Sequence, residues 1–164
     1  MALTTTITLT ISAGYSLVLD LVTKTANLVK SPTVELASGT GLNQADVIFS
    51  DTRSTAGTDS LDLIGGGLLD NLGNAFAPAR LKAIIVVAAA ANPGNVLLRR
   101  PAANGVPFLT AAADEAPIHP GGVFALIAPS AAGYVVTTGT GDLIDLAASA
   151  GTVTYDIYLI GASA

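Results

Sequence analysis

The feature that most constrains the fold is an unbroken apolar run, Ala83–Ala91, in the middle of the 164-residue chain. A short apolar run bounded by turn residues is typical of a buried strand or a buried helix. The four β-branched residues 84–87 and the Pro-Gly turn at 92–95 favour a strand. We therefore expect a buried strand that enters a hairpin and returns through residues 96–98.

Both faces of this strand are apolar. Successive side chains of a strand point to opposite faces, so Ile84 and Val86 lie on one face, and Ile85, Val87 and Ala89 on the other. In a two-layer sandwich only one face of each sheet meets the core. We therefore expect another protein subunit to cover the second face, with Ile85, Val87 and Ala89 as candidate contact residues.

A second segment, Val123–Ala128, is apolar on both faces as well. By the same argument we expect it to contribute to a subunit contact. Phe124 and Leu126 are its candidate contact residues.

The low charge of the chain supports a covered surface. Charged residues make up 12% of the sequence, about half the usual quarter. Because a monomer needs polar residues on its outside, sparse charge indicates that much of the surface lies against neighbours. The alternative is an ordinary monomer rich in alanine and threonine. Arg53, with Arg80 and Lys82, is a candidate for ion pairs at a subunit contact, although solvated surface charge is the commoner role.

Charge and cysteine content argue against several classes of protein. The net charge is −5 and the seven basic residues are dispersed, which disfavours direct nucleic-acid binding. The absence of cysteine excludes disulfides, thiolate metal sites and cysteine nucleophiles. No apolar run approaches the ~20 residues that span a bilayer, and the first ten residues lack a signal-peptide pattern. We expect a protein made in the cytoplasm, with no membrane partner.

Alternating polar and apolar residues recur throughout the chain between turn signals. Residues 3–11 read LTTTITLTI, and residues 152–160 alternate with Val153, Tyr155, Ile157 and Leu159 on one face. About eight to ten short strands with little helix predict an all-β sandwich or barrel. Uneven connections favour a jelly-roll-like antiparallel β-sandwich. We expect one domain over residues 1–164, with an N-terminal arm through residue 22 that stays within its subunit or pairs with a neighbour's sheet.

No catalytic signature is present. His119 is the only histidine, and a serine triad would need it beside a positioned serine and an acid. The chain has no Gly-x-Ser-x-Gly elbow. We expect His119 to be a turn residue held between prolines, and the protein to be no enzyme and to need no cofactor.

The metal candidates are also weak. Residues 139–142 resemble one copy of a calcium-binding nonapeptide repeat, but such sites need stacked copies. We expect Asp142 to bond its own turn backbone instead. Asp59, Asp62 and Asp70 are a further acidic group without a recognisable ligand spacing, and the triglycine 65–67 is not followed by the lysine of a phosphate loop. We expect no metal site.

Five segments, in order along the chain, resemble a family of small proteins encoded beside the major capsid protein in tailed bacteriophages, the capsid decoration or cement proteins. The pattern is QADxIFSDTR, LKAIIVxAA, PGGVxALxAPxAxGY, TGTGDLI and a terminal VTYDIxLIG. The corresponding segments of this chain are Gln44–Arg53, Leu81–Ala89, Pro120–Tyr134, Thr138–Ile144 and Val153–Gly161. The first forty residues lie outside the resemblance.

The resemblance implies a β-rich module bound to the outside of an icosahedral head. Such proteins are often trimers that bridge neighbouring capsomers, so the implied partners are the major capsid protein and further copies of the chain, and the implied location is the virion. No family binding residue is carried over. The alternatives are a carbohydrate-binding jelly-roll module and a head-fibre or tail component of the same virion. A cluster of Tyr15, Tyr134 and Tyr158 in one groove would favour glycan binding.

Overall fold

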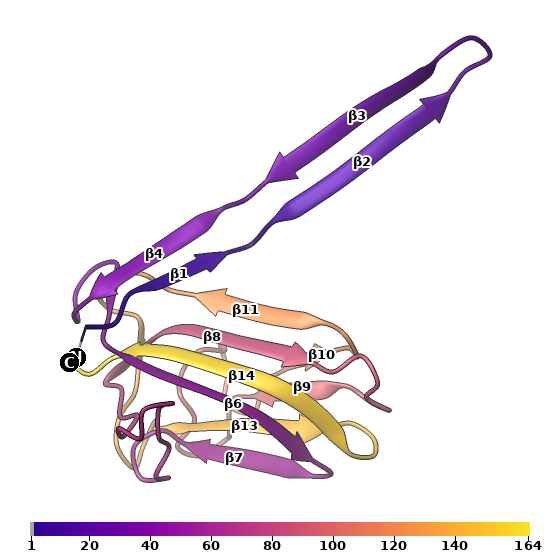
Figure 1. Cartoon of the computed structure of the whole chain (residues 1–164). Helices are drawn as coiled ribbons and strands as arrows, with labels where there is room; N and C mark the ends of the chain where they lie inside the picture. The colour runs from indigo at the N-terminus through magenta and orange to yellow at the C-terminus, as the bar shows by residue number, and fades with distance from the viewer. Residues whose placement is uncertain (1) are drawn as a thin grey trace.

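The computed structural model describes residues 2–164, and these residues form an all-β protein without a helix. The predicted β-sandwich is confirmed. Residues 2–164 contain fourteen strands, more than predicted, because one short strand joins a main sheet, three form a small separate sheet and two form a projecting hairpin. Figure 1 shows the two parts, a sandwich body and a long hairpin that leaves it.

The body consists of two sheets packed face to face. Its eight main strands are β6 (Val47–Thr55), β7 (Thr58–Asp62), β8 (Arg80–Ala88), β9 (Val96–Arg99), β10 (Glu115–Ile118), β11 (Val123–Ile127), β13 (Leu143–Ala148) and β14 (Val153–Ala162). The first sheet has the order β11-β8-β14-β6, and the short β12 (Tyr134–Val135) also pairs with β8. The second sheet has the order β10-β9-β13-β7.

The strand order is that of a jelly roll. β6 pairs with β14, β7 with β13, β8 with β11, and β9 with β10, all antiparallel. The chain therefore runs out from β6 to β9 and returns beside itself from β10 to β14, as one long hairpin. Successive strand pairs alternate between the two sheets, and the pairings of β14 with β8 and of β13 with β9 complete each sheet. This double-sheet arrangement confirms the predicted jelly roll.

The predicted hairpin around the turn at 92–95 is wrong. β8 forms as expected, but β9 belongs to the opposite sheet, so the turn carries the chain across the sandwich. Both edges of β8 are already paired, with β11 and with β14, which leaves no free edge for β9. The turn is bound to the end of β13 in the second sheet, since the Asn95 amide donates to Ser149 Oγ at 2.7 Å.

The main core fills the space between the two sheets. The alternation predicted for the last strand is confirmed, since Val153, Tyr155, Ile157 and Leu159 are all fully buried. They meet inward-facing residues of β8, β9 and β13. β10 pairs with β9 and forms the edge of the second sheet.

The N-terminal strands stand outside this sandwich. β1 (Thr5–Thr8), β4 (Thr33–Ser38) and β5 (Gln44–Ala45) form a small base sheet, in which β4 and β5 are parallel. β2 (Ile11–Val18) and β3 (Thr23–Lys30) continue β1 and β4 as a two-stranded hairpin. We call residues 9–32 the arm. It holds both strands of the hairpin, whereas the predicted arm ended at residue 22.

Replacing Leu159 by alanine should lower the free energy of unfolding by about 2–5 kcal/mol, because it leaves a cavity between the sheets. Urea or guanidinium denaturation measures the loss. Leu72→Ala is the matched control, since Leu72 is 74% exposed and its truncation should change stability by less than about 0.5 kcal/mol. Equal effects of the two substitutions would contradict this position of the core.

Candidate functional site

The outer face of the first sheet is covered at one end by the chain itself. One row of outward side chains crosses the four strands in register: Ile127, Ala83, Ile160 and Ile48. Leu3 and three residues of the base sheet pack on this row and form a second, smaller core with it: Ile7, Val34 and Leu36. The expectation that another subunit must cover the whole face is therefore wrong at this end, because the N-terminal segment covers it.

The next two rows of the same face have no cover within residues 2–164. Five side chains make up this surface, which we call the outer patch: Ile85, Val87, Val123, Ala125 and Tyr158. Val123 is 63% exposed and Tyr158 39%, while Ile85 and Val87 are half-buried. An apolar face therefore runs from the covered row into solvent.

The other predicted contact residues lie elsewhere. Phe124 and Leu126 pack against the main core, so the expectation that they face outward is wrong. The alternation of β11 places Val123 and Ala125 outward instead. Ala89 is half-buried and follows the end of β8.

Arg53 belongs to an internal cluster of polar side chains. Its Nε and Nη2 donate to the two carboxylate oxygens of Asp59 at 2.6 and 3.0 Å, and its Nη1 lies 3.1 Å from Asp51. The hydroxyl of the buried Tyr155 donates to Asp59 at 2.6 Å. The Arg53 hydrogen bonds lower the pKa of Asp59 against the opposing effect of burial, and Tyr155 lowers it further. Arg53 is thus satisfied within its own chain.

Lys82 is a buried cation with carbonyl partners, and no pattern in the sequence indicated this. Its Nζ donates to the backbone carbonyls of Gly41 and Ala131, each at 3.2 Å, and to that of Ser130. Burial lowers its pKa, and nearby Arg80 lowers it further. The register of β8 against β14 shifts at this point. Lys82 therefore ties two loops to the end of the first sheet, beside the base sheet.

The arm carries an apolar stripe on one face. Residues paired across β2 and β3 share a face, and one face contains Ile11, Ala13, Tyr15 and Leu17 with Ala26 and Leu28. We call these six residues the apolar stripe. Tyr15 is 68% exposed and Leu28 51%. Lys24 and Lys30 are paired with Leu17 and Ile11, at its two ends.

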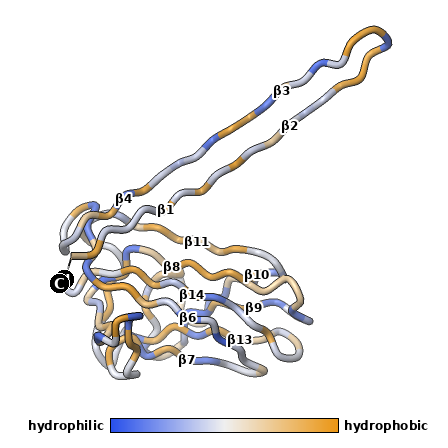
Figure 2. The backbone as a smooth tube through the Cα atoms, viewed as in Figure 1, coloured by the Kyte–Doolittle hydropathy of each residue, from blue (hydrophilic) through white to orange (hydrophobic). Residues whose placement is uncertain are grey.

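The stripe extends the buried face of the base sheet. Leu3 and Ile7, which pack on the body, have the same alternation as Leu9 and the β2 residues of the stripe. Figure 2 shows apolar segments along both strands of the arm out to its tip. At the tip, Val18, Leu19, Leu21 and Val22 are all exposed, Leu21 at 96%. In the sequence, this surface is indicated by apolar residues at every odd-numbered position from Ile7 to Leu21.

An uncovered two-stranded hairpin is marginally stable in water. Full burial of one leucine-sized side chain stabilises by about 1.5–3 kcal/mol, so covering the stripe would contribute substantially. The arm and the outer patch are thus two apolar surfaces without cover among the described residues.

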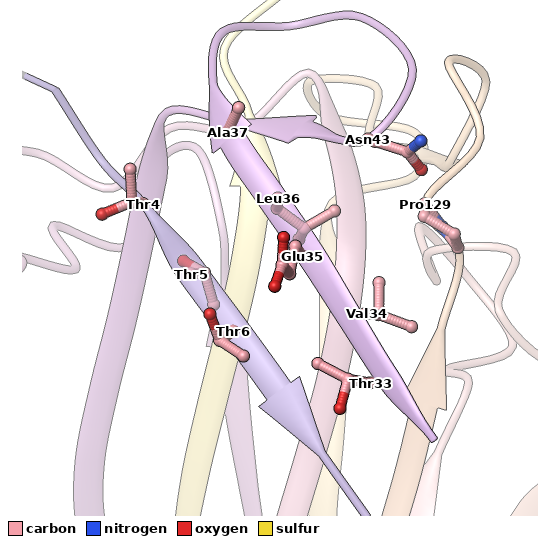
Figure 3. Close-up of a pocket in the computed structure, with 10 residues that line it drawn as sticks. All are labelled: Thr4, Thr5, Thr6, Thr33, Val34, Glu35, Leu36, Ala37, Asn43 and Pro129. Atoms are coloured by element: carbon pink, nitrogen blue, oxygen red, sulfur yellow. The ribbon is translucent and has the colours of Figure 1, made fainter. Parts of the chain in front are cut away.

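A groove of about 810 Å³ is lined mainly by residues of the base sheet, and Figure 3 shows these residues. Glu35 is the only ionisable residue among its lining residues, which are otherwise threonines, small apolar side chains, Asn43 and Pro129. It contains no pair of groups suited to acid–base or nucleophilic catalysis.

The remaining candidates from the sequence are turn residues. His119 is exposed between β10 and β11, and its carbonyl accepts a hydrogen bond from Gly122. Asp142 accepts from the Gly139 amide at 2.5 Å, which confirms its predicted turn role. Asp62 and Asp70 likewise accept from nearby backbone amides. Within residues 2–164, no three acidic or histidine side chains are grouped to hold a metal ion.

Comparison of the chain with protein-family models, curated proteins and solved structures found no match. Residues 2–164 also contain no helix long and apolar enough to cross a membrane.

Asp59→Asn should destabilise the protein at pH 7 by about 1–2 kcal/mol, because Arg53 loses its charged partner in a partly exposed cluster. The pKa of Asp59 is lowered on folding, so its contribution is present above the unfolded value of about 3.9. It is lost as the pH falls through the folded pKa. The difference in Tm between wild type and variant should therefore narrow below pH 4.

Thermal unfolding followed by circular dichroism from pH 2.5 to 7 measures this difference. Asp20→Asn is the matched control, since Asp20 lies at the tip of the arm, and it should leave Tm unchanged throughout. A Tm difference for Asp59→Asn that stays constant over the whole range would contradict the ion pair.

Proposed function

We propose that this chain is a structural virion protein that binds the outer surface of a phage capsid and stabilises contacts between capsomers, as a trimer. The observation that carries the proposal is the arm, whose apolar stripe and tip have no cover within the described chain. Such a surface favours binding to other proteins. The absence of a catalytic grouping in the described hollows is compatible with a structural role.

The five segments that resemble decoration proteins lie mainly on the jelly-roll body. They include most of β6, β8, β11 and β14 and the first two residues of β13, so the resemblance concerns the sandwich, and the arm lies outside it. In this proposal the body is the shared module, and the arm is the part by which this chain reaches its neighbours.

The physics of a filled capsid is compatible with such a role. A packaged genome pushes the shell outward, and a protein that bridges capsomers adds buried area at the seams. A stable interface of this kind buries on the order of 1,200–2,000 Å² and has few charges at its centre. The apolar tip, with Leu21 almost fully exposed, is suited to enter a hollow between capsomers.

Glycan binding has less support. Tyr15, Tyr134 and Tyr158 lie on β2, β12 and β14, and Tyr134 packs against the main core. The groove lined by Tyr158 contains no second tyrosine. A head-fibre or tail position in the virion is the remaining alternative, and cryo-EM separates it from a shell position by where the density lies.

Wild-type protein should co-sediment with capsids that were assembled without it and should raise their temperature of disruption. Replacing Leu19, Leu21 and Val22 by serine should weaken this binding at least tenfold, because the tip would lose the apolar area it buries. Leu72→Ser, a change at an exposed leucine of the body, should leave binding intact.

Failure of the wild-type protein to bind these capsids would overturn the proposed function. Unchanged binding by the tip variant would instead remove only the tip as the capsid contact.

A further inference from the structure

We infer that the arm of one copy lies across the outer patch of a second copy of this chain, with its apolar stripe against Val123, Ala125 and Tyr158. The inference deepens the proposed function, because it names the surfaces that hold the copies together. It rests on that proposal only for the homo-oligomeric state.

The first argument is continuity with a contact that the chain already makes. On the body, the row of Ala83 and Ile160 is covered by Leu3 and Ile7 of the N-terminal segment. Beyond this contact both partners continue uncovered, the body as the outer patch and the N-terminal segment as the apolar stripe. They separate at the base of the arm, which leads away from the sandwich (Figure 1). The outer patch and the apolar stripe are thus both left free, although each continues a surface that is already packed against the other. In a second copy, the stripe of one chain can cover the patch of the other.

The second argument is charge. The arm has two lysines and one aspartate, a net charge of +1, while the rest of the chain has five basic and eleven acidic residues, a net charge of −6. Lys24 and Lys30 lie on the face of the arm that bears the stripe. Asp156 lies beside Val87 on the face of the sheet that bears the patch. Positive side chains therefore border the apolar stripe, and a negative side chain borders the outer patch.

The third argument is length. An eight-residue strand such as β2 spans about 27 Å, whereas four strands at about 4.8 Å spacing are about 15 Å across. The arm is long enough to cross the patch and still extend its tip beyond it, so the tip remains available for a capsid. Contacts in which the arm of one copy lands on another close either as a reciprocal pair or as a ring of three or more copies. The proposed trimer is such a ring.

Engineered cysteines test the contact directly, because the chain has no cysteine of its own. A Leu17→Cys variant is mixed under oxidising conditions with a differently tagged variant that has Cys in place of Val123, Ala125 or Tyr158. We expect a disulfide-linked species with both tags from at least one mixture. Ser16→Cys is the matched control, since Ser16 lies on the opposite face of the arm, and it should cross-link at least fivefold less.

A charge exchange provides the second readout, by sedimentation equilibrium without capsids. Lys24→Glu and Asp156→Lys should each weaken self-association about tenfold, and the double variant should recover most of it. A monomeric wild-type protein, or cross-linking that does not distinguish residue 16 from residue 17, would overturn the inference. Absence of cross-linking together with intact capsid binding would overturn this contact and leave the proposed function standing. Cross-linking together with absence of capsid binding would overturn the capsid role and leave this contact standing.

Discussion

The structure depends on the first sheet being apolar on both faces. β8 lies between β11 and β14, with its inward side chains in the main core. On the opposite face, burial of Ala83 and Ile160 depends on the base sheet. A sheet with two apolar faces needs three layers, and a jelly roll supplies only two. The N-terminal segment supplies the third layer at one end only, so the outer patch remains uncovered.

Two sets of polar side chains stabilise the packing of these layers at the ends of the sheets. Lys82 binds three carbonyls where the base sheet meets the body, which holds the loops from which the third layer begins. The Arg53–Asp59–Tyr155 cluster joins β6, β7 and β14, and so links the two sheets. Neither group faces the arm, and both have their partners within the chain. They stabilise the body.

The separation of body and arm gives a physical basis for the proposed role. The body has a complete core and needs no partner to bury it. The arm is a two-stranded ribbon whose side chains are exposed throughout, so its contribution to stability depends on what it contacts. In the proposed role, contact with a partner would add stability to the arm. The low charge of the whole chain is compatible with such contacts.

Much of the fold followed from local pattern. The alternation in the last strand identified the four core residues of β14, and the apolar run identified β8 as a strand with two apolar faces, because the period of a strand maps directly onto its faces. The sequence by itself also determined the all-β class and the alternation of the first N-terminal strands. It did not determine the partner of β9, the inward direction of Phe124, or the burial of Lys82. Only the tertiary structure decided these, because the pairing of distant strands depends on which edges remain free and which face turns to the core, and no local pattern records either.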